Sequence, residues 1–256
     1  MVELFAGSGS LSRLLRKRKL PTIAWDIVYG PWFDLTNRHS LAVLIGWMTS
    51  GKVSALWMGT PCQGLSRARR GPPGGKMPCA LRSPLAVRGL ANLRGRDLQA
   101  LRTSNFMADV AGRLEHLAYK LGIPGGEENP ASSYLWQFPS RKRLVQRPEV
   151  ETRIVDYCAC GRPFRARTQL LFWHWRPPEQ LTALRCVGRG ICSFSGRAHD
   201  QLSGAQPGKN KFMTALKNAY PEMMCKILAD SLSKVITRTQ ASRRWTQIRF
   251  GKQHNA

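Results

Sequence analysis

Short apolar runs alternate with stretches of helical spacing along this chain, and that alternation constrains its fold most strongly. Apolar runs lie at residues 2–6, 22–27, 53–59 and 168–173. The run "VSALWMG" is almost continuously apolar, which is typical of a strand buried on both faces. Strands that alternate with helices predict an α/β fold. We expect a Rossmann-like, doubly wound, mostly parallel sheet with helices on both faces and a small loop-rich insertion.

The helical stretches have distinct signals. "SLAVLIGWMTSGK" predicts a helix with Ser40 as its N-cap, and residues 66–96 are rich in Gly, Pro and Arg and predict a loop. Apolar residues at i, i+3 and i+4 spacing then predict a helix from residue 97 and another late in the chain. Their apolar positions are Met107, Val110, Leu114, Leu117 and Leu121 in the first, and Met224, Leu228, Leu232 and Ile236 in the second.

The predicted organisation has four parts. Residues 1–175 form the catalytic core, and residues 176–210 form a short insertion with a candidate metal site. Residues 211–237 hold a late helix that returns to the core, and residues 238–256 form a basic tail. A hydrophobic content of 43% is that of a globular chain.

The charge is strongly positive. Forty Lys and Arg residues against 15 Asp and Glu give a net charge of +25. This excess favours a polyanionic partner, and nucleic acid, most simply DNA, is expected because neutralised phosphates release counterions. The alternative is a basic protein solvated by counterions. Residues 172–176 are mostly aromatic, and they predict either base stacking or the edge of a core strand.

The compartment is suggested by the cysteines and by the missing targeting signals. Seven cysteines do not form a disulfide scaffold, no signal peptide is recognised, and no apolar run reaches the ~18 residues of a membrane span. We expect an intracellular monomer without membrane contact, nuclear in a eukaryote and cytoplasmic otherwise.

Polar clusters follow several of the predicted strands. In parallel sheets ligands bind outside the carboxyl ends of the strands, so clusters at that edge predict one site. A carboxylate about 20 residues after a Gly-rich turn can accept hydrogen bonds from ribose hydroxyls. The loop lacks the third glycine of the dinucleotide-binding pattern GxGxxG, which favours an adenosine-bearing cofactor without a pyrophosphate. The alternative role for the carboxylate, Asp26, is that of a helix N-cap or turn residue. The clusters are Gly7, Ser8 and Gly9; Asp26; Pro61, Cys62 and Gln63; and Glu128 with Asn129.

Cys62 in "TPCQG" is a candidate nucleophile. A thiolate attacks electron-poor carbon, and nearby cations such as Arg67, Arg69 and Arg70 favour the thiolate. Glu128 is the candidate acid that protonates the ring nitrogen of an attacked heterocycle. The alternative is that Cys62 is a small buried core residue, as most free cysteines are.

These motifs together resemble the cytosine-5 DNA methyltransferases. "ELFAGSGSLSRLL", "GTPCQGLS", "EENP", "GRPFRARTQLLF" and "NAYPEMMCKILADSL" occur in the order of that family's motifs. The resemblance implies the class I methyltransferase fold, S-adenosylmethionine as cofactor, and methyl transfer to C5 of cytosine. It covers most of residues 2–236. "SSYLWQFP" and "DYCACGRPFRARTQ" also resemble methyltransferase-like segments of retroelements.

The resemblance also implies roles for individual residues. Cys62 would add to C6 of a cytosine extruded from the stack, and Glu128 would engage N3. Arg165 and Arg167 resemble the arginine pair that supports the base. The cofactor would lie over Phe5, Ala6, Gly7, Gly9 and Pro61, with Asp26 on the ribose, Asp34 at the adenine edge, and Asn218 in the motif that returns to the pocket.

The sequence departs from the family pattern in four places, one of which is that no clear copy of the family's motif before the late helix is visible. Pro130 replaces Val, and Asn-Pro also resembles the motif of amino-methylating enzymes. The arginine motif is shortened, and only about 40 residues lie where the family carries its recognition domain. The alternatives are therefore an RNA cytosine methyltransferase, an amino methyltransferase that uses Asn129 and Pro130, or a catalytically weak nucleic-acid-binding module.

A second group of soft ligands lies near the insertion. Thiolates and one imidazole are the ligands that tetrahedral zinc sites use, although C-x-C followed by C-x5-C-x6-H is not a standard finger. The alternative is scattered thiols in a loop-rich segment. The candidates are Cys158, Cys160, Cys186, Cys192 and His199.

Overall fold

The computed structural model describes residues 1–69, 71, 78–202, 216 and 218–251, with 240–251 as backbone only. A six-stranded sheet has the order β2-β1-β3-β4-β6-β5. The first four strands in that order are parallel, and β6 is antiparallel to both of its neighbours. The strands are β1 (Val2–Leu4), β2 (Ile23–Trp25), β3 (Leu56–Met58), β4 (Gly125–Pro130), β5 (Val150–Asp156) and β6 (Arg167–Trp173).

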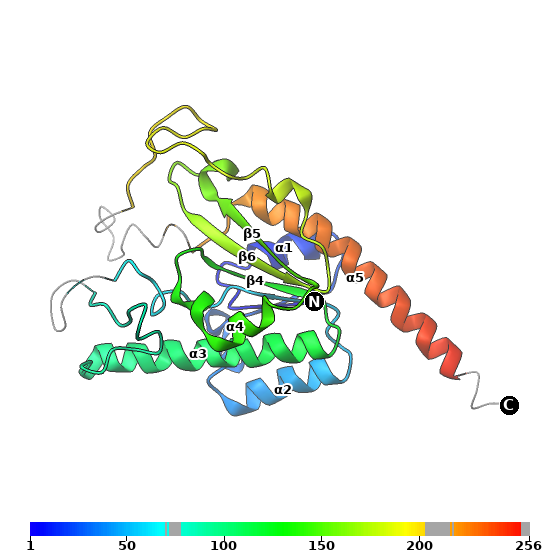
Figure 1. Cartoon of the computed structure of the whole chain (residues 1–256). Helices are drawn as coiled ribbons and strands as arrows, with labels where there is room; N and C mark the ends of the chain where they lie inside the picture. Colours follow the sequence, from blue (N-terminus) through cyan, green and yellow to red (C-terminus); the bar gives the residue numbers. More distant parts are fainter. Residues whose placement is uncertain (70, 72–77, 203–215, 217, 252–256) are drawn as a thin grey trace.

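Helices cover both faces of this sheet (Figure 1). Because successive strand side chains point to opposite faces, Trp57 and Phe172 pack toward one helix layer, and Leu56 and Trp173 pack toward the other. The mixed α/β architecture with a mostly parallel sheet is thus confirmed. One layer holds α1 (Ser10–Lys17) and α5 (Glu222–Gly251); the other holds α2 (Arg38–Thr49), α3 (Gly95–Lys120) and α4 (Pro139–Leu144).

Most expected helices and strands are present, with local differences. The late helix buries its four predicted apolar positions. It continues to Gly251, however, and so crosses the boundary placed at residue 237. Ser40 is not the N-cap of α2: the Asn37 side chain accepts the His39 N–H at 2.8 Å, and Ser40 is buried in the first turn.

The region around β6 contains one strand more than expected, and it decides between the two alternatives for the aromatic residues in favour of the core. Residues 150–156 form a strand that the sequence did not predict, paired along its whole length with β6. Phe172 and Trp173 are fully buried between the helix layers, so they are core side chains and do not form a base-stacking surface. No helix in the described part of the chain has the length and apolarity to cross a membrane.

A buried ion cluster ties β4 to α3 and α4. Arg141 donates to both carboxylate oxygens of Glu127, at 2.6 and 2.9 Å, and lies 3.4 Å from Glu115. All three side chains are fully buried. Neither oxygen of Glu115 has a hydrogen-bond partner among the described residues. Burial raises the pKa of Glu115, although Arg141 opposes that effect.

Candidate functional site

The site is positioned by the point where the strand order reverses. The chain passes from β1 to β2 on one side and then crosses to β3 on the other side of β1. In open α/β sheets ligands bind in the crevice outside the carboxyl ends of such strands. The loops that leave β1 and β3 meet there: Gly59 N–H donates to Leu4 O at 3.0 Å, and a Cβ on Gly59 would lie 2.6 Å from the Tyr220 hydroxyl.

The loop after β1 is a tight turn whose backbone is left-handed at alternate positions. Phe5, Gly7 and Gly9 have φ angles of 54°, 52° and 61°. A Cβ on Gly9 would lie 2.6 Å from the Tyr29 hydroxyl, which donates to Gly7 O at 2.9 Å. A Cβ on Gly7 would meet nothing within 4 Å. The loop therefore presents open backbone at Gly7, next to the N-terminus of α1.

Two of the predicted cofactor residues, Asp26 and Asp34, have local structural roles. Asp26 accepts the N–H of Gly7 at 2.9 Å and the N–H of Val28 at 3.0 Å, so it caps the 3-10 helix η1 (Ile27–Tyr29). Asp34 accepts Thr36 N–H at 2.8 Å and shapes a turn. Asn218 is exposed. The alternative role for Asp26, a turn and cap residue, is what the structure shows directly.

Tyr220 reaches the crevice in the segment where Asn218 was expected to do so. Its hydroxyl packs against Gly59 and hydrogen-bonds Glu128. Ala6 donates its N–H to Trp25 O at 3.4 Å, and Pro61 is exposed beside a cavity.

Cys62 and Glu128 are brought to one wall of the crevice. The Asn129 amide donates to Thr60 O at 2.5 Å and so joins the loop after β3 to the end of β4. The Tyr157 hydroxyl donates to Glu128 at 3.4 Å. Burial raises the pKa of Tyr157 well above its usual value, and the nearby groups of Glu128 and Cys62 raise it further. Tyr157 thus lies within electrostatic range of both predicted catalytic groups.

Glu128 is set up to hold a proton near neutral pH. Burial raises its pKa to about 7, even though hydroxyl donors favour the carboxylate. The Thr168 hydroxyl, at the start of β6, hydrogen-bonds Glu128 and also Asn129 O at 3.0 Å. Tyr157, Thr168 and Tyr220 were not predicted from the sequence, and no short motif marks them. A large fraction of Glu128 is therefore a neutral acid at pH 7.

The two arginines of the "RPFRAR" motif do not extend freely into the crevice. Both donate Nε to the fully buried Asp156 at 3.3 Å. Arg165 also donates to Gly188 O at 2.6 Å and to Cys186 O. Arg165 thus anchors the insertion. Arg167 is half-exposed and stands next to Thr168, which touches Glu128.

Of the other arginines expected near Cys62, Arg69 donates to Cys79 O at 2.9 Å and to Asp97 at 3.1 Å, and Arg67 lies over the Tyr134 ring. Arg70 lies outside the described residues.

A cavity of about 380 Å³ opens between the Pro61 turn and α3. Its lining includes Pro61, Gln63, Arg69, Arg96, Ser104 and Met107.

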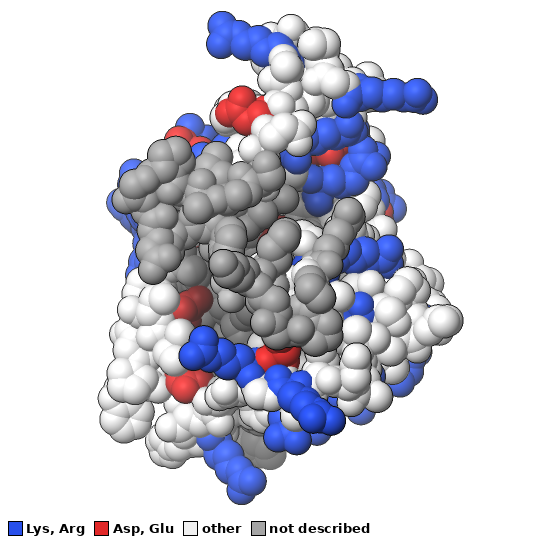
Figure 2. Space-filling view, turned by 90° about the vertical axis from the view of Figure 1, so that its left-hand side faces the viewer, with Lys and Arg blue, Asp and Glu red and all other residues white. Residues whose placement is uncertain are grey.

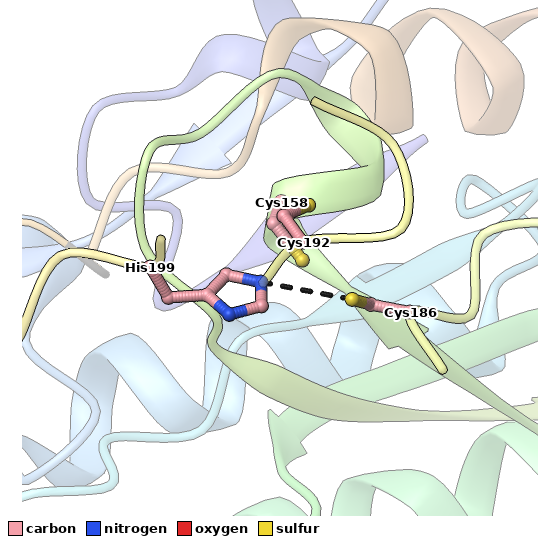
Figure 3. A group of neighbouring side chains, drawn as sticks. All are labelled: Cys158, Cys186, Cys192 and His199. Atoms are coloured by element: carbon pink, nitrogen blue, oxygen red, sulfur yellow. Dashed lines mark hydrogen bonds between the residues drawn. The ribbon is translucent and has the colours of Figure 1, made fainter. Parts of the chain in front are cut away.

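Four of the five predicted metal ligands form one cluster (Figure 3). The ligand atoms of Cys158, Cys186, Cys192 and His199 lie within 4.8 Å of one another. The three cysteines are buried, and Cys186 Sγ lies 3.6 Å from His199 Nε2. Ligand atoms of a tetrahedral zinc site lie roughly 3.5–3.8 Å apart, given bonds of about 2.0–2.3 Å. This buried Cys/His cluster could hold a metal.

Cys160 is not part of the cluster, contrary to the prediction. It packs in the core against α5, and burial raises the pKa of its thiol to about 11. Cys158 and Cys160 both belong to the 3-10 helix η4 (Tyr157–Cys160), in which successive side chains are about 120° apart. The two thiols therefore point to different sides of η4.

The surroundings lower the pKa of the Cys186 and Cys192 thiols, whereas burial raises the pKa of Cys158 to about 12. Burial opposes ionisation of Cys186, but hydrogen bonds from Ser193 outweigh it, so the pKa of this thiol is lowered. The Ser193 hydroxyl donates to Cys186 Sγ at 3.5 Å, and the N–H of Cys186 donates to Asp156 at 3.0 Å. Hydrogen-bonded thiolates of this kind suit a metal ligand set.

The candidate site is described from the contacts within this chain alone. No protein-family model matches the sequence, and a search of curated proteins found no match.

Proposed function

We propose that this protein is an S-adenosylmethionine-dependent methyltransferase that methylates C5 of cytosine in nucleic acid, DNA in the first instance, through a covalent Cys62 adduct. The carrying observation is that Cys62 and Glu128 follow or end two neighbouring parallel strands, β3 and β4, whose ends are joined by the hydrogen bond from Asn129 to Thr60 O at 2.5 Å.

The loop after β1 fits the cofactor. Gly7 leaves open backbone where a side chain would otherwise stand, and Asp26 sets a carboxylate beside that backbone. Each carboxylate oxygen has two lone pairs, so Asp26 can still accept a ribose hydroxyl while it caps η1. The cofactor would supply the methyl group, and its adenosine end would lie at Gly7 and Asp26.

The chemistry then assigns one step to each residue. The Cys62 thiolate forms a bond to C6, while the neutral Glu128 carboxyl hydrogen-bonds or protonates N3, so that the electron pair becomes available at C5. C5 then takes the methyl group from the bound cofactor, whose sulfonium C–S bond is cleaved so that it leaves as the neutral thioether. A base then removes the C5 proton, the C5–H electron pair restores the C5–C6 double bond, the thiolate leaves C6, and N3 returns its proton to Glu128. Burial of Glu128 keeps the required proton in place near pH 7.

The buried state of Asn129 disfavours the amino-methyltransferase alternative. That chemistry needs an acceptor oxygen that faces the substrate amine. The Asn129 Oδ1 atom has no hydrogen-bond partner among the described residues, but it is buried, as is the whole residue, and Nδ2 donates to Thr60 O. The basic residues Arg69 and Arg96 beside the cavity near Pro61 favour a nucleic-acid substrate over a small molecule.

The first test identifies the methylated nucleoside. The purified protein is incubated with methyl-labelled S-adenosylmethionine and with duplex DNA, single-stranded DNA or RNA, and the polymer is then digested to nucleosides. We expect the product to be 5-methylcytosine, and the polymer that is methylated most rapidly identifies the substrate. An N-methylated base would support the amino methyltransferase instead. Cofactor binding without any product would support the nucleic-acid-binding module.

We also propose that the cluster of Cys158, Cys186, Cys192 and His199 binds one zinc ion. The matched test uses two alanine variants of η4: Cys158→Ala should lose most of the bound zinc, and Cys160→Ala should keep it, because only the first removes a ligand. Zinc per chain is measured by elemental analysis, and tetrahedral thiolate absorption is measured after cobalt substitution. Equal zinc content in both variants and the wild type would exclude this ligand set.

A further inference from the structure

The loop of residues 185–199, which we call the knuckle loop, exposes its apolar side chains. Val187, Ile191 and Phe194 are 82%, 58% and 48% exposed. The loop folds through a tight turn, in which Cys192 N–H donates to Arg197 O at 2.7 Å and Gly196 N–H donates to Cys192 O at 2.9 Å. The cysteines point inward and these three side chains point outward, so this apolar surface is not used for packing.

The knuckle loop is also positively charged. Arg185, Arg189 and Arg197 are exposed, and residues 185–199 contain no Asp or Glu; the exposed Asp200 follows. Figure 2 shows Lys and Arg side chains that project from the uppermost part of the molecule, the height at which the yellow knuckle loop lies in Figure 1. Apolar and aromatic side chains between arginines are what single-stranded nucleic acid binds, because unpaired bases stack while phosphates pair with the cations.

The knuckle loop is held rigidly to the core. Arg165 donates to the carbonyls of Cys186 and Gly188, and Asp156 accepts the Cys186 N–H. A Cβ on Gly188 would lie 1.8 Å from Ile191 O, so the turn requires glycine there. A cavity of about 350 Å³ beside the loop is lined by Arg165, Arg189, His199 and Asp200, so its lining includes two guanidinium groups and one carboxylate.

We propose that the knuckle loop binds single-stranded nucleic acid, with Phe194 stacking on an unpaired base, Ile191 in apolar contact with the bases, and Arg189 and Arg197 on the phosphates. The knuckle loop is connected to the methyl-transfer site through Asp156. Asp156 accepts hydrogen bonds from Cys186 in the loop and from Arg167, and the neighbour of Arg167, Thr168, hydrogen-bonds Glu128. This inference rests on the metal site and deepens the proposed function by adding a recognition surface in the short insertion.

The test measures binding rather than methyl transfer, so it stands apart from the activity. The zinc-loaded Cys62→Ser protein is titrated into fluorescent single-stranded DNA, single-stranded RNA and duplex DNA, and anisotropy is followed at several salt concentrations. Phe194→Ala should weaken single-strand binding about tenfold, since one stacked base contributes roughly 1–3 kcal/mol. The double variant R189Q/R197Q should reduce the slope of log K against log salt by about 1–2.

Matched controls come from outside the loop. Phe106 on α3 is similarly exposed, and Arg143 on α4 is exposed on the other helix layer, so Phe106→Ala and Arg143→Gln should bind like the parent. Zinc content is checked in every variant. The proposal is overturned if Phe194→Ala and R189Q/R197Q bind single strands as tightly as the controls do. It is also overturned if their losses are equal for duplex DNA and for heparin, which would indicate general polyanion binding or an acidic protein partner.

Discussion

Replacing Cys62 by serine is expected to lower methyl transfer by on the order of 10³-fold or more, while cofactor binding and the fold stay intact. A serine hydroxyl is a far weaker nucleophile than a thiolate, because it stays protonated at neutral pH. Cys62 is half-buried at a strand end and does not fill the core, so the exchange leaves the packing unchanged. The rate is measured as labelled methyl incorporated into polymer, and cofactor affinity by calorimetry.

Cys79→Ser is the control for this prediction. Cys79 is buried in the loop between β3 and α3, and its thiol donates to Ala80 O at 3.4 Å, a contact that serine can keep. The Cys79→Ser variant should therefore transfer methyl groups at the wild-type rate. If Cys62→Ser turned over as fast as Cys79→Ser, the covalent mechanism would be excluded and an amino methyltransferase would gain support.

Replacing Arg141 by methionine is expected to lower the free energy of unfolding by about 3–5 kcal/mol, as is found when one partner of a buried ion pair is removed. The change leaves Glu127 without its two guanidinium hydrogen bonds, and it leaves Glu115 beside another buried carboxylate. Urea unfolding followed by circular dichroism measures the loss. A change below about 1 kcal/mol would show that the cluster is not a stabilising ion pair.

Glu115→Gln, in contrast, should raise the free energy of unfolding at alkaline pH. The pKa of Glu115 is raised by burial, so the folded state holds its proton more tightly than the unfolded state does. The stability that this proton brings is present below the unfolded pKa of about 4.5 and is lost as pH rises through the folded value. The amide that Glu115→Gln introduces cannot ionise, so the variant should be more stable than the wild type at a pH of about 8.5 and show a flatter pH profile. Urea unfolding across the pH range measures this, and a steeper profile would contradict the interpretation.

The parts of the fold that the sequence predicted well are those with one dominant cause. Continuous apolar runs predicted β1 and β3, and spacing predicted the late helix, because burial on one or both faces dictates those patterns. The strand β5 was missed because its residues are half polar and lie at the sheet edge, where its alternation is weak. Neighbouring cysteines suggested Cys160 as a ligand, but a 3-10 turn separates it from Cys158.

The candidate site was predictable only in its outline. Strand ends brought Cys62 and Glu128 to one edge, as the parallel topology requires. The polar groups that tune Glu128 come from Tyr157, Thr168 and Tyr220, which lie far apart in sequence and carry no motif. The pairing of Arg165 and Arg167 with Asp156 depends on the β5–β6 register, which sets Asp156 opposite Arg167.

Covalent trapping tests the proposed chemistry most directly. The wild type and Cys62→Ser are incubated with S-adenosylmethionine and with DNA or RNA that carries 5-fluorocytosine, whose fluorine cannot leave as the C5 proton does. We expect the wild type to form an adduct that survives denaturant and contains both methyl group and polymer, and we expect Cys62→Ser to form none. An absent adduct on both polymers, with cofactor and nucleic acid bound, would contradict attack by Cys62 on cytosine C6.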